Sequence, residues 1–170
     1  IGSTRGASMD LDINPMGSSS QFFEPLMIRR LVNSPTCTEP FWEGDVALER
    51  DEFKFSPVPR GPLKLWLHLD HESKPPLGRY GAGADLSSGN GTTNSCFSIV
   101  NASTGEKVLE YTTPFLQPYP FAERCVWLCR QFVDANGTTA LFAWEIPGPG
   151  ADFGVRVIEL GYLRVHFRTN

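Results

Sequence analysis

The residues best able to do chemistry in this chain lie close together in the run His68-Leu-Asp-His-Glu72. Imidazole and carboxylate groups at this spacing could hold a divalent metal ion. On a strand, His68 and Asp70 would share one face, with His71 just past the strand end. A metal site needs a further ligand, and His166 is the only distant histidine. The run is more typical of a polar strand face that ends in a charged turn, so we expect no bound metal or cofactor.

A glycine-rich segment, residues 78–85, is the second place where chemistry could occur. Such a segment could bind a dinucleotide phosphate, but Leu86 stands where that fingerprint needs its third glycine. No Gly-Lys-Ser/Thr follows it, and the chain contains no Gly-x-Ser-x-Gly nucleophile motif. We therefore predict a loop for residues 78–85. The sequence predicts no catalytic residue and no enzymatic activity.

The four cysteines fit no metal-binding spacing. Cys125 and Cys129 would lie about 13 Å apart on one face of a strand, which is too far for a disulfide. Cys37 and Cys96 are isolated in sequence. We therefore expect four free thiols, which is typical of a protein from a reducing compartment.

The elements that would position these residues are predominantly strands. Two apolar runs, 124–133 and 138–146, flank the pair Asn136-Gly137, which tolerates the positive φ of a tight turn. They predict two paired antiparallel strands at the centre of a sheet. Residues 63–70 alternate between leucine and polar side chains and predict a half-buried strand. Residues 154–167 predict a further long strand with a bulge beside Gly161.

Shorter elements complete the predicted fold. Strands are predicted at 46–49 and 52–56, a second hairpin at 96–100 and 107–111, and a long loop at 74–93. Pro25 suits the first position of a short helix that ends before Pro35. About eight strands and one short helix predict an all-β fold, either a two-sheet sandwich or a barrel.

Composition limits the class of protein. A chain of 170 residues with 41% hydrophobic and 20% charged residues is typical of one globular domain. No apolar run approaches the roughly 20 residues that span a membrane. The net charge of −4 argues against a general nucleic-acid binder. Residues 1–21 are polar and rich in glycine and serine, which predicts an extended N-terminal arm before a folded domain at 22–170.

Four segments resemble capsid proteins of the picorna-like viruses, the picornavirus and comovirus type in the order Picornavirales. Residues 108–121 resemble the apolar stretch and proline-aromatic turn before the last two strands, and residues 151–158 the start of the closing strand. Residues 23–31 are similar to the short helix near the amino end, and residues 60–65 to the strand entry after it. The resemblance implies an eight-stranded antiparallel jelly-roll β-sandwich. It also implies release from a polyprotein, which would explain the initial Ile1.

The function implied by this resemblance is structural. The chain would be a capsid protein, not an enzyme, in the icosahedral shell of a positive-strand RNA virus. Its partners would be further copies, sister jelly-roll subunits, the viral genomic RNA bound weakly without sequence specificity, and a host receptor. It would be located in the virion after assembly in the host-cell cytoplasm, without membrane insertion. We expect the large apolar side chains at the start of the domain to contact neighbouring subunits: Phe22, Phe23, Leu26, Met27, Ile28 and Leu31.

Two other interpretations stay open at this point. One is a secreted or cell-surface β-sandwich that binds glycans or receptors, as a lectin or cytokine-like module does. Glycosylation sequons at Asn90, Asn101 and Asn136 favour it, although such triplets are frequent by chance. The other is a cupin-like β-barrel enzyme that uses His68 and His71.

Overall fold

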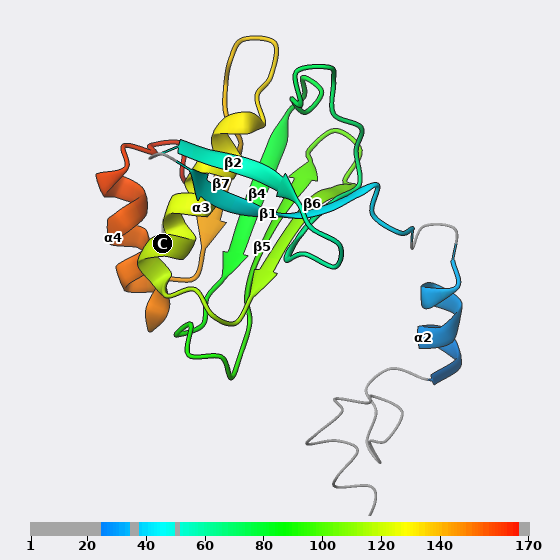
Figure 1. Ribbon diagram of the computed structural model, residues 1–170, viewed down its shortest axis with the longest axis horizontal. Coiled ribbons are helices and arrows are strands. Elements are labelled where there is room, and N and C mark those ends of the chain that lie inside the picture. Colours follow the sequence, from blue (N-terminus) through cyan, green and yellow to red (C-terminus); the bar gives the residue numbers. More distant parts are fainter. Residues whose placement is uncertain (1–24, 35–37, 50–51, 167–170) are drawn as a thin grey trace, which may run out of the picture. The chain divides into compact units, whose positions relative to one another are not determined.

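The computed structural model describes residues 25–34, 38–49 and 52–166 (Figure 1). The chain divides into two compact units, Ile1–Glu39 and Pro40–Asn170. In the first unit, helix α2 (Pro25–Val32) is described, which confirms the short helix that begins at Pro25. The predicted arm at 1–21 lies outside the described residues. No helix among the described residues is long and apolar enough to cross a membrane.

The second unit is built on one mixed sheet. Its seven described strands lie in the order β2-β1-β3-β6-β5-β4-β7. Every neighbouring pair is antiparallel except β4 and β7, which run parallel. The strands are β1 (Trp42–Glu49), β2 (Glu52–Pro57), β3 (Leu63–Leu65), β4 (Tyr80–Asp85), β5 (Ser95–Asn101), β6 (Lys107–Thr113) and β7 (Leu141–Trp144).

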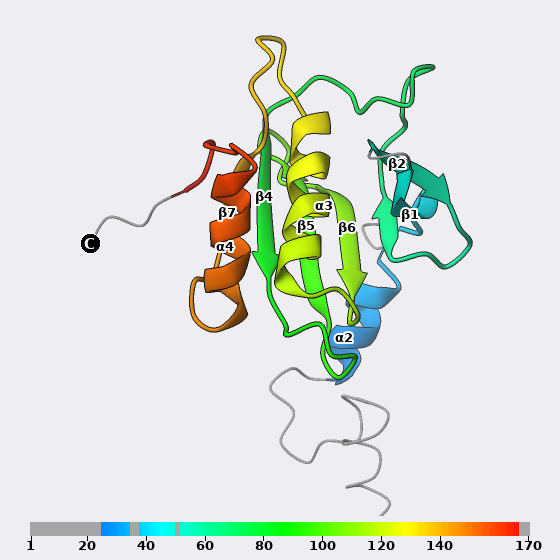
Figure 2. The same ribbon diagram turned by 60° about the vertical axis from the view of Figure 1, so that its left-hand side comes forward.

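Two helices cover one face of this sheet. Helix α3 (Pro118–Gln131) and helix α4 (Pro149–Glu159) lie side by side over β4, β5, β6 and β7 (Figure 2). Their buried aromatic side chains, Phe121 and Phe153, pack against Phe142 and Tyr111 of the strands. The core therefore lies between a helical layer and a sheet. The predicted all-β jelly roll is wrong, because a jelly roll buries its core between two antiparallel sheets.

The segment 124–133 is the largest error in the predicted elements. It belongs to α3 and not to a central strand. Phe121, Cys125, Leu128 and Phe132 are buried at spacings of four, three and four, which is the period of a helix face and not of a strand. The turn was predicted correctly, with Gly137 at φ 76°. Around it, however, the described pairing is a single bridge between Val133 and Thr139.

The segment 154–167 begins as a helix, because α4 continues to Glu159. Phe153 and Val157, four positions apart, face the core from α4, and Gly161 follows the helix at φ 70°. Among its described residues, only Val165 makes a strand contact, a parallel bridge to Phe142 of β7. The alternation beyond the helix was misread as one continuous strand, because valine and isoleucine are frequent in strands but do not exclude a helix.

Of the remaining predicted elements, two hairpins are confirmed and two segments differ from the prediction. The strands at 46–49 and 52–56 are confirmed as the β1–β2 hairpin, and 96–100 with 107–111 as the β5–β6 hairpin. Residues 63–70 form a strand only over Leu63–Leu65. The loop predicted for 74–93 is wrong over Tyr80–Asp85, because this glycine-rich segment is β4 and pairs on both sides.

Candidate functional site

Two carboxylates stand at the ends of the only parallel pair among the described strands. Asp85 is the last residue of β4, and Glu145 directly follows Trp144, the last residue of β7. The register pairs Ala84 with Trp144, so Asp85 and Glu145 come next on adjacent strands. Neighbouring strands are about 4.8 Å apart. The two acids, far apart in the sequence, therefore lie beside each other at the carboxyl ends of β4 and β7. Ligand sites commonly lie at this end of parallel strands.

Both acids are on the face away from the helices. Ala82 and Phe142 pair with each other and are buried beneath α3 and α4. Side chains alternate between the two faces of a strand, so Gly83 and Asp85 share the opposite face of β4. Glu145 continues the same alternation beyond β7, and both acids are exposed. Solvent and a large ligand can therefore reach both carboxylates.

The small residues of β4 leave room in front of these acids. A Cβ added at Gly83 would meet no heavy atom within 4 Å, so the face beside Asp85 is open space. Glycine inside a strand often marks a place where a ligand or another backbone comes close. The glycines that led to the prediction of a loop thus leave a strand surface without side chains beside Asp85.

The segment that follows Asp85 is held by a buried pair of serines. The main-chain N–H of Ser87 donates to Oγ of Ser95 at 2.9 Å, and Oγ of Ser87 donates to the carbonyl of Thr93 at 2.8 Å. Both serines are buried. The N–H of Gly91 donates to the carbonyl of Pro114 at 2.8 Å. These bonds fix the loop that leads away from Asp85.

Glu145 is supported from the start of α4. A Cβ at Gly150 would collide with the carbonyl oxygen of Glu145, so only glycine lets the helix approach this closely. The ring of Trp144 packs against Phe153 with ring centroids 5.6 Å apart. The helix therefore sits directly behind the Glu145 main chain and limits its movement.

A basic residue and an imidazole lie on the outer side of β7. The N–H of Phe142 donates to the carbonyl of Arg164 at 3.0 Å, and the N–H of His166 donates to the carbonyl of Phe142 at 2.8 Å. Val165 packs against the core. By strand alternation, Arg164 and His166 then project toward the face that carries Glu145, and both are exposed.

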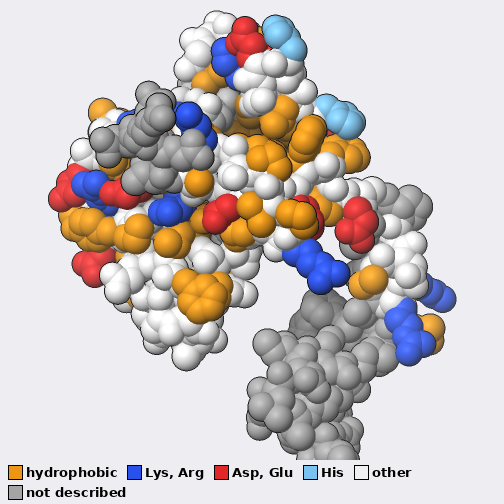
Figure 3. All heavy atoms as spheres, viewed as in Figure 1, with side chains coloured by type: hydrophobic (Ala, Val, Ile, Leu, Met, Phe, Trp, Pro, Cys, Tyr) orange, Lys and Arg blue, Asp and Glu red, His pale blue; other side chains and the backbone are white. Residues whose placement is uncertain are grey.

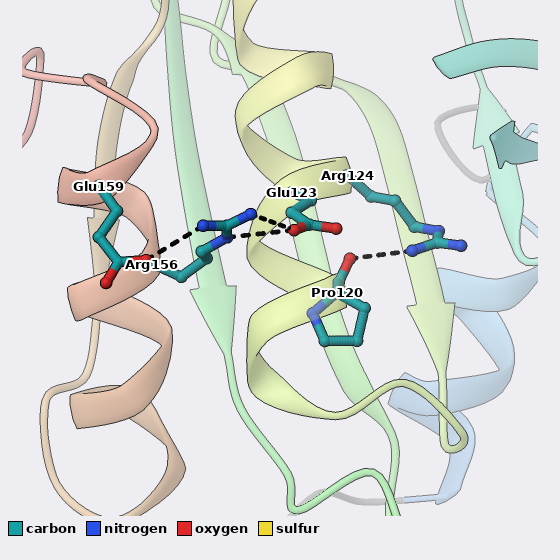
Figure 4. A network of polar contacts seen from close by, with 5 residues as sticks. All are labelled: Pro120, Glu123, Arg124, Arg156 and Glu159. Atoms are coloured by element: carbon teal, nitrogen blue, oxygen red, sulfur yellow. Dashed lines mark hydrogen bonds and ion pairs between the residues drawn. The ribbon is translucent and has the colours of Figure 1, made fainter. Parts of the chain in front are cut away.

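An ion-pair network ties the two helices together behind the site. Arg156 of α4 binds Glu123 of α3 and Glu159 of its own helix, the latter at 3.1 Å (Figure 4). Hydrogen bonds from these carboxylates, that of Glu123 first, raise the pKa of Arg156. Figure 3 shows acidic and basic side chains next to each other over α3 and α4. The network joins the helices on the side opposite the open face, so we assign it a structural role.

The sequence-predicted cluster at 68–72 has a local structural role. His68 stacks on Phe41 with ring centroids 4.4 Å apart. Asp70 accepts the main-chain N–H groups of Glu72 and Lys74 at 2.9 Å each, and these bonds, that of Lys74 first, hold its pKa below the usual value. His71 is exposed. Within the part of the chain that the structure describes, no group of three or more His, Cys, Asp or Glu converges as a metal cluster does.

Asp85 and Glu145 were missed by sequence reasoning. The signal that could have found them is weak: each acid ends a run of small or apolar residues, Gly-Ala-Gly-Ala before Asp85 and Leu-Phe-Ala-Trp before Glu145. Nothing local in the sequence indicates that the two runs are neighbours. Their proximity depends on the parallel pairing of β4 with β7.

Other predicted residues have mixed outcomes. Cys96, Cys125 and Cys129 are free thiols, and burial raises the pKa of the last two. Cys37 lies outside the described residues.

Of the expected inter-subunit contacts, Leu26 and Met27 are exposed on α2. Phe22 and Phe23, and the side chains of Ile28 and Leu31, lie outside the described part, so contact of this segment with another subunit stays a prediction.

Comparisons with known proteins give structural similarity only. No family model and no curated protein sequence matches the chain. The large terminase nuclease from thermophilic phage G20c with bound magnesium matches at a TM-score of 0.49 and 16% identity, over 64% of this chain and 51% of that chain. The same nuclease with bound zinc matches at 0.47 and 16%, over 64% and 56%. The chain thus spans about half the length of these nuclease chains, and similarity at this level assigns no activity.

These findings correct the capsid hypothesis. The sheet is mixed and covered by helices on one face, whereas the picorna-like resemblance implies two packed antiparallel sheets. The picorna-like resemblance, the role as a shell subunit and the location in the virion are therefore wrong, and the expectation that the chain is not an enzyme, which followed from that role, is withdrawn. The lectin-like or cytokine-like sandwich and the cupin-like barrel fail with the all-β fold.

Proposed function

We propose that the unit Pro40–Asn170 is a metal-dependent phosphodiester hydrolase that acts on nucleic acid. The observation that supports this most is the pair Asp85 and Glu145, brought together on the open face at the ends of adjacent parallel strands. Two carboxylates side by side, with open space in front of them, suit a divalent cation that a phosphate must also reach.

The topology around the pair supports the same class. Strands β6, β5 and β4 form an antiparallel meander, β7 lies parallel beside β4, and Val165 adds a parallel contact on the far side of β7. Helices follow β6 and β7 and cover one face. We interpret this order as a ribonuclease H-like arrangement, and we infer that a nucleic-acid strand approaches the face without helices, where Asp85 and Glu145 lie.

The donor set fits a hard cation. Carboxylate oxygens suit Mg²⁺ or Mn²⁺, and Mg²⁺ is usually held by one or two carboxylates, with waters and substrate phosphates as its other ligands. Asp85 and Glu145 would hold the ion. When bound, such an ion polarises a phosphoryl oxygen and lowers the pKa of its water. The Ser87–Ser95 hydrogen bond holds the chain after Asp85, and the close packing of Gly150 holds the main chain of Glu145. The strand surface at Gly83 stays open.

The test is hydrolysis of fluorescent single-stranded and duplex oligonucleotides with Mg²⁺ or Mn²⁺. Asp85→Asn and Glu145→Gln should each lower kcat on the order of a hundredfold or more, because each removes charge that a metal-assisted transition state needs. Glu106→Gln is the matched control, since this exposed acid lies in the turn between β5 and β6, at the other end of the strands. Circular dichroism checks that all variants remain folded.

Two results would refute the proposal. One is wild-type protein that cleaves no phosphodiester substrate with either ion. The other is cleavage that persists unchanged in Asp85→Asn and Glu145→Gln, which would assign the activity to other residues or to a contaminant.

A further inference from the structure

A cavity opens at the same end of the strands as the carboxylate pair. It measures about 470 Å³ and lies between the turn before β3, the end of β6 and the first turns of α3. Two arginines, Arg60 and Arg124, contribute to its lining, together with Asp45, Thr112 and Phe115. None of these residues belongs to the carboxylate pair.

The cavity carries an excess of positive charge. Its lining holds two guanidinium groups and one carboxylate, and Asp45 already accepts hydrogen bonds from the Tyr111 hydroxyl at 3.1 Å and the Val46 N–H at 2.7 Å. Among the described residues, the guanidinium of Arg60 has no hydrogen-bond or ion-pair partner. Such a guanidinium fork suits a phosphate, whose oxygens it can bind in pairs.

The two arginines are held differently. Nε of Arg124 donates to the carbonyl of Val46 at 3.3 Å and one Nη to that of Pro120 at 3.0 Å (Figure 4), and its guanidinium carbon lies 5.5 Å from the centre of the Phe53 ring. Arg60 has a positive φ of 58°, and its N–H donates to the Glu43 carboxylate at 2.8 Å. A non-glycine residue in this region of φ is uncommon and costs backbone strain. The turn therefore fixes the main chain of Arg60 while its side chain stays available.

An exposed aromatic ring stands beside the arginines. Phe115 is 76% exposed, an unusual position for a phenyl ring with no apolar cover. It lies against the loop that follows Asp85, where a Cβ at Gly91 would be 3.2 Å from the ring. Exposed aromatic rings next to basic groups are the combination that binds unpaired nucleic acid, since bases stack on the ring and phosphates meet the cations.

The cavity lies close to the carboxylate pair. Asp85 pairs with Cys96 on β5, and Cys96 pairs with Thr112 on β6. Thr112 lines the cavity and is two strand spacings from Asp85, about 10 Å. The cavity therefore lies at the same end of the strands as the carboxylate pair, but Tyr111 and Arg124 line it from the helix-covered face, so a strand that reaches both places must pass around the end of the sheet.

We propose that this cavity is a nucleotide subsite for an unpaired strand. Arg60 and Arg124 hold one phosphodiester, and Phe115 stacks on an adjoining base. The subsite rests on the proposed function for its role beside a cleavage site, but its binding of nucleic acid requires no metal ion and no hydrolysis.

The experiment measures binding of a short fluorescein-labelled oligothymidylate to the full chain in EDTA, by fluorescence anisotropy at several salt concentrations. Arg60→Gln and Phe115→Ala should each raise Kd on the order of tenfold, the loss expected for one stacking or phosphate contact. Arg60→Gln should also reduce the slope of log K against log salt by about 0.7. Arg124 is left unchanged because its bonds to Val46 and Pro120 support the fold.

Matched controls come from the opposite end of β4. Arg79→Gln removes the same charge from an exposed side chain before the strand, and Leu77→Ala removes an apolar side chain that is 67% exposed. Both should bind as the wild type does. A duplex of the same length should bind more weakly than the single strand, because its bases are not free to stack on Phe115.

Each outcome decides the subsite separately from the hydrolase. Weaker binding by Arg60→Gln and Phe115→Ala, without any hydrolysis by the wild type, would keep the subsite and refute the proposed function. Hydrolysis that depends on Asp85, with Kd and KM unchanged in both subsite variants, would keep the function and refute the subsite. A wild type that does not bind the oligothymidylate, or that prefers the duplex, would also refute it.

Discussion

Two regions of this chain carry closely spaced acids, and they differ in what surrounds them. In residues 68–72, acids and histidines are neighbours in sequence, at the end of an alternating run. In the β4–β7 region, Asp85 and Glu145 are distant in sequence and become neighbours through strand pairing. The first region looks richer in chemistry, but its groups serve a turn and a stacking contact.

The difference shows that position in the fold decides more than local density. The carboxylate of Asp70 is occupied by two main-chain N–H groups of its own turn. By contrast, Asp85 stands at the end of a parallel strand pair whose helix-facing side is buried, with open space at Gly83 on the other side. A ligand site requires side chains held by well-packed elements and an open path by which the ligand can reach them.

Truncating the buried side chain that packs beneath the β4–β7 pair should have the largest effect on stability. Phe142 of β7 is 0% exposed and packs edge-on against Phe97 and Phe153 with ring centroids 5.5 and 5.8 Å apart. Phe142→Ala should lower the free energy of unfolding by about 3–5 kcal/mol, because it leaves a cavity in the core. His68→Ala removes an exposed ring stack and should cost less than about 1.5 kcal/mol. Urea unfolding measures both, and equal losses would contradict the contrast.

A side chain added at Gly83, on the open surface beside Asp85, should have an intermediate effect, and on activity only. Gly83→Val places a branched side chain beside Asp85 on a strand that tolerates it, so stability should change by less than about 1 kcal/mol. The KM for an oligonucleotide should rise on the order of tenfold, because the strand can no longer approach the acids. Gly81→Val, two positions earlier and against Val100, is the control. Unchanged kinetics in Gly83→Val would place the substrate elsewhere.

The smallest effect concerns the pH dependence of the turn at Asp70. Its folded-state pKa is lowered by the main-chain N–H of Lys74, so the charged carboxylate stabilises the fold above the unfolded pKa. The wild type should unfold at slightly more urea than Asp70→Ala at neutral pH. This difference should shrink as the pH falls through the folded pKa, where the carboxylate becomes protonated. A difference that persists unchanged in acid would contradict the assignment of the turn bonds to the charged form.

The elements that sequence could predict are those defined by local signals. The β1–β2 and β5–β6 hairpins have alternating side chains around a turn, and α2 begins at Pro25. Helix α3 was missed because valine, tryptophan and phenylalanine are common in strands, although the burial of Phe121, Cys125 and Leu128 follows a helical period. Strand β4 was missed because glycine is unfavourable in strands, and it is stabilised by pairing with two neighbours.

The candidate site could not be predicted for a related reason. Asp85 was visible at the end of a glycine-rich run, but the run was assigned to a loop. Glu145 was assigned to a hairpin with the wrong partner. Only the parallel pairing of β4 with β7, a contact between distant segments, brings these acids together. His68, Asp70 and His71 were singled out because they are neighbours in sequence, whereas Asp85 and Glu145 were overlooked.

The most direct test of this account is the position of a bound metal ion. Crystals of the chain soaked in Mn²⁺ would be measured at a wavelength where manganese scatters anomalously. We expect an anomalous peak bound to carboxylate oxygens of both Asp85 and Glu145, at about 2.0–2.3 Å. The same peak should be absent from Asp85→Asn crystals. A peak at His68, Asp70 or His71, or no ordered ion beside Asp85 and Glu145, would contradict the central claim.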